Sequence, residues 1–397
     1  MKTNIAVFFG CRSVEHEVSI ISAVQAMRAI NHDKYDVTPV YVAKDGTMYT
    51  GENLFDIENY RDLPKLENDA EKVTFIKDDG AVKMHCLNRK MFKKTPDTVI
   101  DVAFPIVHGT NCEDGTVAGY LEFLGLPYVG CDIISAAVGM DKKVFKDVLK
   151  SAGLPVLDCV RFTSREYALG KDEIVKKLGT EIGYPLIIKP VNLGSSVGIS
   201  KVNSENELDE AIKLGFSFAD IVLAEKAITS LREINCSVLG DIDECFASVC
   251  EEPFMHDEIL SYNDKYMGGG KSGGASKGMA SLGRKIPADL PPEKSDEIRE
   301  ISCRIFKALG ASGVVRIDYL LDTETDKVYA NEINTIPGSL AFYLWEATNL
   351  KYSDMIDKLI EIAFRRQRKR ENLTFTIDTN ILSGVSFGSK GAKGAKF

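Results

Sequence analysis

The sequence predicts an α/β protein of two to three domains, and three observations favour this fold class. The chain has 397 residues, of which 44% are hydrophobic, and that is too long for one ordinary core. Short apolar runs alternate with segments of helical spacing in the first third of the chain, as in a sheet with parallel strands. Two later runs around a polar turn predict a β-hairpin.

In the first third, residues 5–9 and 37–42 are predicted strands, and the apolar spacing of residues 18–30 between them predicts a helix. Residues 102–107 form another apolar run of strand type. The polar, mixed composition of residues 51–100 predicts no regular element.

Later elements follow the same periodicities. Predicted strands cover residues 186–189, 222–225 and 233–239, the hairpin pairs 314–321 with 327–333, and predicted helices cover 140–152, 295–309 and 352–366. The glycine-rich residues 267–283 predict a mobile loop. The Gly, Ala and Lys residues of 388–397 predict a disordered tail.

Composition excludes several functional classes. The formal net charge of −9 argues against a nucleic-acid partner, and no apolar run approaches the ~18 residues that would cross a bilayer. The N-terminal run predicts a buried strand and not a signal peptide, because no small-residue cleavage site follows it. The nine cysteines contain no Cys-x-x-Cys pair, which favours free thiols in a reducing cytoplasm.

The predicted hairpin carries the most informative polar residues. Arg316 and Asp318 share one face of the first strand, and Glu332 and Asn334 share one face of the second. If the turn centres near Thr325, Asp318 faces Glu332 and Arg316 faces Asn334. Such oxygens suit Mg²⁺, and a permanent cation suits an anionic transition state. A surface ion pair on a solvent-facing strand explains the pattern equally well.

Other polar residues lie at predicted strand ends. Lys189 precedes a Gly/Ser loop that includes Gly194, Ser195 and Ser196, and such a loop can cradle phosphates, although it is not a Walker A motif. Glu225, Lys226 and Glu233 can contact a nucleotide base and ribose, or can simply be solvated charges.

His108 and Glu15 follow two predicted strands and therefore fall on the ligand-binding rim of the sheet. The alternative is a structural histidine and an acid that favours a helix N-terminus.

In sequence order, these segments resemble the D-alanine–D-alanine ligase family of ATP-grasp enzymes. The resemblance covers residues 4–365 and rests on FGCRSVEHEVS from Phe9 to Ser19, HGTNCEDG from His108 to Gly115, GMDK ending at Lys142, KPVNLGSSVG from Lys189, Glu225-Lys226, Arg232-Glu233, NDKY ending at Tyr266, Arg316-Ile-Asp318 and NEINTIPG ending at Gly338.

The resemblance implies an ATP-grasp fold, with an N-terminal parallel α/β domain followed by two α+β subdomains that clasp ATP. The implied boundaries are 1–135 for the N-terminal domain, 136–226 for the central subdomain, 227–370 for the catalytic C-terminal subdomain and 371–397 for a flexible tail. It also implies a cytoplasmic homodimer that joins two D-alanines through an acylphosphate for peptidoglycan synthesis.

Residue roles carry over from the same resemblance. The implied ATP ligands are Lys142, Lys189, Gly194, Ser195, Ser196, Glu225, Lys226, Glu233 and Lys265. The implied ligands of two Mg²⁺ ions, which Mn²⁺ can replace, are Asp318, Glu332 and Asn334. Glu15 would bind the ammonium of the first amino acid near His108. Arg316 and the Gly338 amide would stabilise the oxyanion, and Tyr266 would close the site with Glu15 and Ser195.

Two departures from the family pattern lie on the acceptor side. Cys112 stands where the family usually has glycine, and Tyr343 stands where a serine binds the carboxylate of the acceptor. A shift of the alignment would give that contact to Ser339 and leave Tyr343 in the core. Two other functions therefore stay open: a ligase for another acceptor, such as D-serine, D-lactate or a non-cell-wall amine, and a catalytically silent nucleotide-binding regulator.

Overall fold

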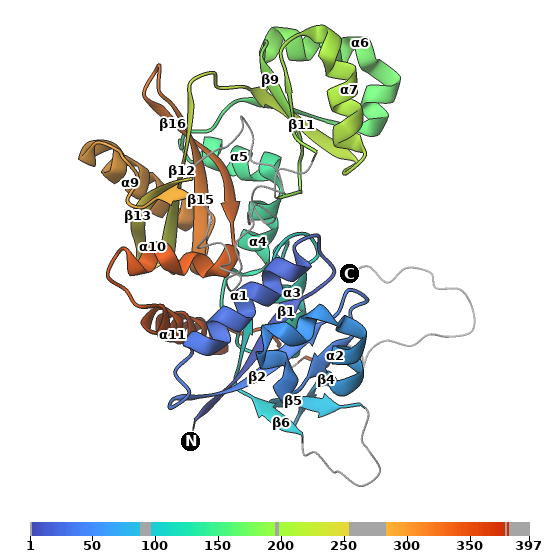
Figure 1. Ribbon diagram of the computed structural model, residues 1–397, viewed down its shortest axis with the longest axis vertical. Helices are drawn as coiled ribbons and strands as arrows, with labels where there is room; N and C mark the ends of the chain where they lie inside the picture. The colour runs from blue at the N-terminus through green and yellow to red at the C-terminus, as the bar shows by residue number, and fades with distance from the viewer. Residues whose placement is uncertain (1, 88–96, 195–197, 254–282, 378, 381–397) are drawn as a thin grey trace.

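The computed structural model describes residues 2–87, 97–194, 198–253, 283–377 and 379–380, and these residues form three sheets (Figure 1). Along the long axis of the molecule, the N-terminal sheet lies at one end and the second sheet at the other, with the third sheet between them. No helix of the described ranges is long and apolar enough to cross a membrane.

The N-terminal sheet has the strand order β6-β5-β4-β3-β2-β1-β7. Its strands are β1 (Thr3–Gly10), β2 (Tyr35–Val42), β3 (Met48–Thr50), β4 (Glu71–Asp78), β5 (Ala81–Cys86), β6 (Thr98–Ile100) and β7 (Val102–Pro105). Only β2, β1 and β7 are parallel, so the expected parallel sheet is correct for this part alone. The segment in which no element was predicted, residues 51–100, supplies β4, β5 and β6 as short antiparallel strands.

The helical elements of this region are α1 (His16–Ala29), η1 (Glu52–Phe55), η2 (Ile57–Arg61), α2 (Leu63–Asp69) and α3 (Thr116–Leu124). The predicted helix over 140–152 is confirmed as α5 (Lys142–Ser151), and α4 (Ile133–Met140) directly precedes it. Asp141 separates them because its side chain accepts from the amides of Lys143 and Val144, both at 2.9 Å, and so caps α5.

The second sheet is antiparallel, with the order β10-β9-β11-β8. It comprises β8 (Cys159–Thr163), β9 (Leu186–Pro190), β10 (Ser200–Val202) and β11 (Ile221–Lys226), together with α6 (Ser164–Glu181) and α7 (Glu205–Phe216). Buried apolar residues of these strands and both helices form one core, so the outward faces of β9 and β11 are free to line a site.

The third sheet has the order β14-β13-β12-β15-β16. Its strands are β12 (Leu231–Gly240), β13 (Cys245–Pro253), β14 (Arg284–Lys285), β15 (Gly313–Asp322) and β16 (Lys327–Asn334), and α9 (Pro292–Ala308) packs on β12 and β13. The predicted hairpin is confirmed as β15 and β16.

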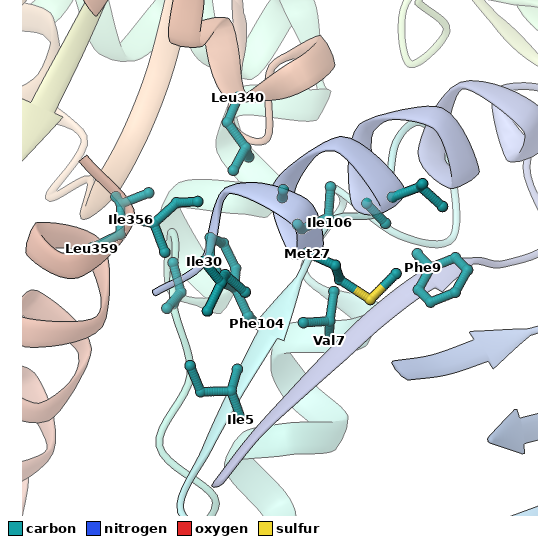
Figure 2. Close-up of a cluster of buried hydrophobic side chains, with 14 of the residues drawn as sticks. Ile5, Val7, Phe9, Met27, Ile30, Phe104, Ile106, Leu340, Ile356 and Leu359 are labelled. Carbon is teal, nitrogen blue, oxygen red and sulfur yellow. The ribbon is translucent and has the colours of Figure 1, made fainter. Parts of the chain in front are cut away.

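The chain then returns to the N-terminal sheet through η4 (Gly338–Ala341), α10 (Phe342–Glu346) and α11 (Tyr352–Glu371). Ile356 and Leu359 of α11 share a buried core with Ile5 and Phe104 (Figure 2). Leu340 belongs to the same core, so the segment that follows β16 is packed against the N-terminal region.

Candidate active site

A pocket of about 250 Å³ lies between the second and third sheets. Its polar lining comes from β9 and β11 on one side, from β12, β15 and β16 on the other, and from the start of α5. It includes Lys142, Lys189, Glu225, Lys226, Glu233, Asp318 and Glu332. Seven of the sequence-predicted nucleotide and metal residues are therefore brought together, although they are separated by up to 190 positions in the chain.

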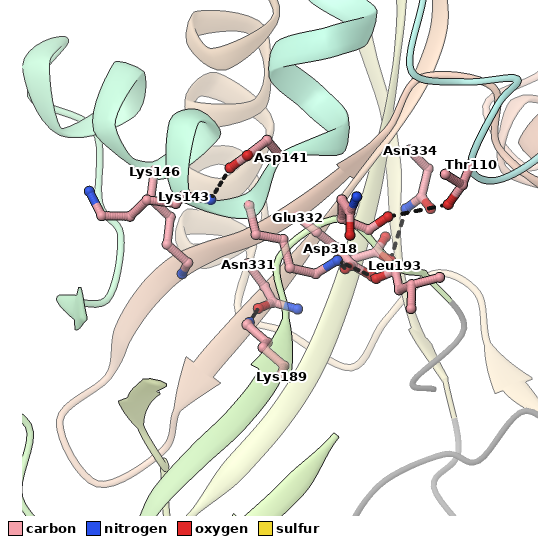
Figure 3. A network of polar contacts seen from close by, with 12 residues as sticks. Thr110, Asp141, Lys143, Lys146, Lys189, Leu193, Asp318, Asn331, Glu332 and Asn334 are labelled. Carbon is pink, nitrogen blue, oxygen red and sulfur yellow. Dashed lines mark hydrogen bonds and ion pairs between the residues drawn. The ribbon is translucent and has the colours of Figure 1, made fainter. Parts of the chain in front are cut away.

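The register of β15 and β16 matches the predicted one, with Arg316 opposite Asn334 and Asp318 opposite Glu332. Arg316 donates to both oxygens of Asp318 at 2.7 Å. The Asn334 amide donates to one of these oxygens at 3.1 Å (Figure 3). A carboxylate oxygen has two lone pairs, so this arrangement leaves acceptor capacity on Asp318 for a cation.

A β-bulge modifies the second strand of this pair. Asp318 pairs with Glu332 but Tyr319 pairs with Ala330, so Asn331 is the extra residue. Asn331 and Glu332 are both partly exposed, whereas Ala330 and Ile333 on either side are buried. Two consecutive polar residues therefore line the pocket, which strict alternation does not predict, and Asn331 is a site residue that sequence reasoning missed.

A buried charge network forms the floor of the pocket. Lys189 Nζ lies 2.5 Å from Glu225 Oε1 and donates to Asn331 Oδ1 at 2.9 Å. Lys146, which is only 2% exposed, forms an ion pair with Glu225 Oε2 at 3.0 Å, without hydrogen-bond geometry. Burial alone would raise the pKa of Glu225, but the charges of Lys146 and Lys189 outweigh it and lower the pKa to about 2.

This network changes what Glu225 can do. Its carboxylate is ionised, lies between two lysines and is 3% exposed, so it positions Lys189. Contact with a nucleotide base at this strand end therefore falls to the backbone of β11 and not to the Glu225 side chain. Lys146 was not predicted from the sequence. Its one signal is its position one turn after Lys142 on the same helix, which places both on one face.

Lys142 stands at the start of α5, where the Asp141 cap separates the two helices. Its ammonium donates to the Leu193 carbonyl at 2.6 Å and lies 3.1 Å from Glu332 Oε2. Lys142 thus connects the metal-type carboxylates with the loop that carries Gly194. A fixed cation at this point suits a transferring phosphoryl group.

A second, smaller cavity of about 40 Å³ adjoins the first, and Lys142 and Glu332 line both. Glu15, Gly109, Glu113, Gly194 and Asn334 also line it. Gly109 has φ of +80°, and a Cβ there would lie 2.4 Å from Ser13 Oγ, so this close approach requires glycine. Glu15 is 8% exposed and is therefore available only from within the cavity.

Glu113 is a further residue of this cavity that sequence reasoning did not single out for a role. Its two oxygens accept from the Gly109 amide at 2.8 Å and the Ile336 amide at 2.9 Å. Burial, and then the neighbouring charge of Glu15, raises the pKa of Glu113 to about 8. The carboxyl group joins the loop after β7 to the end of β16.

His108 is buried deeper than the predicted rim position suggests. It is 2% exposed, and its two ring nitrogens lie 2.8 Å from the Ile336 carbonyl and 2.9 Å from Ser22 Oγ. Burial lowers the pKa of His108, so the neutral ring is favoured. Both ring nitrogens of His108 are used within the protein, so neither is available for the predicted contact with a substrate.

The chain after Gly338 adopts an unusual backbone conformation. Ser339, Leu340 and Ala341 have φ of 51°, 54° and 51°, three consecutive non-glycine residues in the left-handed region. Each such residue costs about 1–2 kcal/mol, and strained backbone of this kind concentrates at functional sites. All three side chains are buried, so packing offsets the strain.

The two acceptor-side candidates have separate surroundings. Ser339 Oγ donates to Gln25 Oε1 at 2.8 Å and is fully buried. The Tyr343 hydroxyl donates to Glu251 Oε1 at 3.2 Å, and the Arg284 guanidinium lies 4.2 Å from the centre of its ring. Burial, and then the charge of Glu251, raises the pKa of Tyr343 to about 12.

Four predicted site residues, Ser195, Ser196, Lys265 and Tyr266, lie outside the described residues, as does most of the predicted loop 267–283. Within the described ranges, no group of three or more His, Cys, Asp or Glu side chains could hold a metal ion. The predicted set differs from such a group because it combines two carboxylates with the amide of Asn334. All nine cysteines are free, as expected.

The comparisons with known proteins agree along nearly the whole chain. Residues 4–131 match the family described as D-ala D-ala ligase N-terminus, and residues 148–361 match D-ala D-ala ligase C-terminus. The chain is 40% identical over 379 residues to the D-alanine–D-alanine ligase of Thermosipho melanesiensis, covering 96% of this chain and 98% of that protein. It is 38% identical to that of Acetivibrio thermocellus, covering 94% and 98%.

Solved structures give the same result. The D-alanine–D-alanine ligase of Coxiella burnetii has a TM-score of 0.78 at 30% identity, covering 93% of this chain and 96% of that one. The VanG D-Ala:D-Ser ligase of Enterococcus faecalis has a TM-score of 0.76 at 31% identity, covering 91% and 100%. With both family regions matched and the ATP-grasp fold present, the chain belongs to the D-alanine–D-alanine ligase family of ATP-dependent ligases.

Proposed function

We propose that this enzyme joins two D-alanine molecules through an acylphosphate, with ATP as phosphoryl donor, to supply a precursor of peptidoglycan. The observation that carries the proposal is the position of Lys142 and Glu332, which line both the nucleotide-sized pocket and the smaller cavity that holds Glu15. A phosphoryl group transferred between the two cavities would pass these residues.

In this proposal, Lys142 and Lys189 contact the phosphates, Lys226 and Glu233 contact the adenosine, and Gly194 belongs to the loop over the phosphates. Glu225 acts on Lys189 through its buried ion pair. Ser195, Ser196 and Lys265 are assigned to the same nucleotide by resemblance alone.

Asp318, Glu332 and Asn334 would hold two Mg²⁺ ions, and Mn²⁺ suits the same oxygen donors. The side chains of Glu332 and Asp318 are 21% and 17% exposed at the pocket, and their oxygens suit a hard cation. A bound divalent cation would offset the negative charge of the phosphates.

The carboxylate of the first D-alanine, held by its ammonium at Glu15, would take the γ-phosphate, and ADP would leave. The amine of the second D-alanine would then attack the acylphosphate carbon, and phosphate would leave. Arg316 and the Gly338 amide would stabilise the negative oxygen of the tetrahedral intermediate. Tyr266 and Ser195 would help to exclude water, because an acylphosphate hydrolyses readily.

A different acceptor is the second candidate, and Tyr343 at the usual serine position favours it. The D-alanine acceptor is better supported, because relatives at 40%, 38% and 35% identity carry the name D-alanine–D-alanine ligase. The test is phosphate release from ATP and product identification with D-alanine, D-serine, D-lactate and L-alanine. Release with D-serine or D-lactate but not with D-alanine would overturn the main proposal, and no release with any substrate would favour the silent regulator.

We also propose that the enzyme works in the cytoplasm as a homodimer. Phe123 of α3 and Ile134 of α4 are 91% and 71% exposed, and large exposed apolar side chains of this kind favour a partner surface. Sedimentation of the wild type and of Phe123→Glu tests this, and a wild-type monomer would refute it.

A further inference from the structure

Gly338 and the left-handed residues that follow it are held from two sides by the N-terminal region. The Ser339 amide donates to Ser22 Oγ of α1 at 2.9 Å, and Ser22 is 1% exposed. The Ile336 carbonyl lies 2.8 Å from His108 Nδ1, and His108 Nε2 lies 2.9 Å from the same Ser22 Oγ. The three groups therefore form one continuous buried chain from Ile336 to Ser339.

The partners in this chain fix the direction of every hydrogen bond. A carbonyl oxygen only accepts, so His108 Nδ1 must carry the hydrogen that is directed at Ile336. In the neutral ring Nε2 is then an acceptor, and the Ser22 hydroxyl donates to it. The Ser22 oxygen is left to accept from the Ser339 amide. Each donor has one acceptor, and both ring nitrogens of His108 are used within the protein.

We infer that Ser22 and His108 are positioning residues that hold the segment from Ile336 to Ala341 and thereby aim the Gly338 amide at the negative oxygen of the tetrahedral intermediate. The inference rests on the proposed function, because the oxyanion role of Gly338 belongs to it. It reassigns His108, which acts on the peptide backbone of the catalytic segment and not on the substrate.

The chain offers a matched control for Ser22 one turn earlier on the same helix. Ser19 is also fully buried, its hydroxyl donates to the Ile106 carbonyl at 2.6 Å, and its oxygen accepts from the Gly10 amide at 2.8 Å. Ser19 thus has the same chemistry and burial as Ser22, but both of its partners lie at the ends of β1 and β7, outside the segment that follows β16.

The experiment measures kcat and KM for ATP and D-alanine in Ser22→Ala, His108→Asn, the double variant and Ser19→Ala. We expect Ser22→Ala and His108→Asn each to lower kcat by about ten- to a hundredfold, since a misplaced donor loses oxyanion stabilisation. The KM for ATP changes less than about twofold. The double variant resembles the worse single one, because residues that act as one unit are not additive. Ser19→Ala lowers Tm similarly but keeps kcat within about threefold.

Two results would overturn the inference. Equal kcat losses in Ser22→Ala and Ser19→Ala would show a structural role only. A higher KM for the first D-alanine with unchanged kcat in His108→Asn would show that His108 contacts substrate. Should Ser22→Ala not fold, His108→Asn and its comparison with Ser19→Ala decide the question.

A structural measurement separates this inference from the proposed reaction. Amide hydrogen exchange at Ser339 reports the bond to Ser22 whether or not the protein makes a dipeptide. Faster exchange in Ser22→Ala than in Ser19→Ala is expected. If the wild type makes no dipeptide with any substrate, the proposed function fails while this exchange result stands. Unchanged exchange at Ser339 beside an active wild type refutes the positioning chain alone.

Discussion

The nucleotide side and the acceptor side of the site are built differently. On the nucleotide side, charged side chains project from strands of two sheets, and their position follows from strand periodicity and register. On the acceptor side, the important groups are backbone amides in an irregular segment, held by side chains from distant loops and a helix. The first kind of site loses function when a charge is removed, and the second when a supporting hydrogen bond is removed.

The largest expected effect lies where the two sides meet, at Glu332. Glu332→Gln removes one proposed metal ligand and leaves Lys142, which is 5% exposed, without its carboxylate neighbour. We expect ATP turnover to fall by roughly a hundredfold or more, equivalent to about 3 kcal/mol, with the fold retained. Phosphate release at increasing Mg²⁺ and a thermal melt provide the measurements.

Glu324→Gln, on the exposed turn of the same hairpin, is the control and should keep wild-type turnover. Normal turnover in Glu332→Gln would refute the assignment of Glu332 as a metal ligand. It would also weaken the distinction between a nucleotide side that depends on charged side chains and an acceptor side that depends on backbone amides.

The next largest effect concerns the floor of the nucleotide pocket. Lys146→Met preserves the buried volume but deletes one of the two cations that flank Glu225. Lys189 then remains the single counter-ion of Glu225, so it is less available to phosphate. We expect the KM for ATP to rise by about tenfold, while the KM for D-alanine stays within about twofold.

Lys150→Met, one turn further along α5 with an exposed Asp158 partner, should leave both constants unchanged. An equal rise in both KM values in Lys146→Met would show general damage and not a nucleotide effect.

The sequence alone was sufficient for much of the nucleotide side. The spacing of Arg316, Asp318, Glu332 and Asn334 predicted a shared face, and the register confirms it. The bulge at Asn331 was not predictable, because the extra residue breaks the alternation on which the prediction rests. The mixed part of the N-terminal sheet was also missed, since its short strands carry many exposed charges.

The acceptor side was less predictable for a different reason. Ser22, Glu113 and His108 act on backbone groups more than 200 residues away, and no local pattern marks such pairings. The motif around His108 indicated that the segment matters, but the structure was needed to show its partner. Lys146 was missed because a buried lysine on an amphipathic helix is indistinguishable in sequence from an exposed one.

Glu113, which connects the loop after β7 to the end of β16, should make the stability of the folded protein depend on pH. The pKa of Glu113 is about 8 in the folded protein and near 4.5 when unfolded, so the folded state binds the proton more tightly. The contribution of Glu113 to the free energy of unfolding is therefore fully present at low pH. It is lost as pH rises from about 4.5 to 8, by at most about 1.4 kcal/mol per pH unit.

Urea unfolding of the wild type and Glu113→Gln at pH 5 to 8 checks the sign. The variant leaves one backbone amide without its acceptor, so it is expected to be less stable at pH 5. The difference in the free energy of unfolding between wild type and Glu113→Gln becomes smaller as pH rises. A deficit that widens with pH would show that the carboxylate, and not the acid, is the preferred folded form.

The smallest expected effect on stability, and the one that best sharpens the comparison, is at Tyr343. Among the described residues, its hydroxyl donates to the buried Glu251 carboxylate, which also accepts from Asn235 at 3.0 Å and Arg284 at 2.9 Å. Removing the hydroxyl in Tyr343→Phe leaves the other two, and the ring still lies beneath the Arg284 guanidinium. The cost to stability is therefore about 1 kcal/mol.

If Tyr343 and Arg284 face the carboxylate of the acceptor, the loosened pair raises the acceptor KM by about tenfold, while the KM for ATP and for the first D-alanine hardly moves. Ser339→Ala is the matched alternative, because its buried hydroxyl donates to Gln25 Oε1 at 2.8 Å and its removal is expected to leave the acceptor KM unchanged. A rise in acceptor KM in Ser339→Ala but not in Tyr343→Phe would place acceptor recognition on the left-handed turn. Recognition would then depend on the same backbone segment as the oxyanion amide, and the acceptor side would be a single unit.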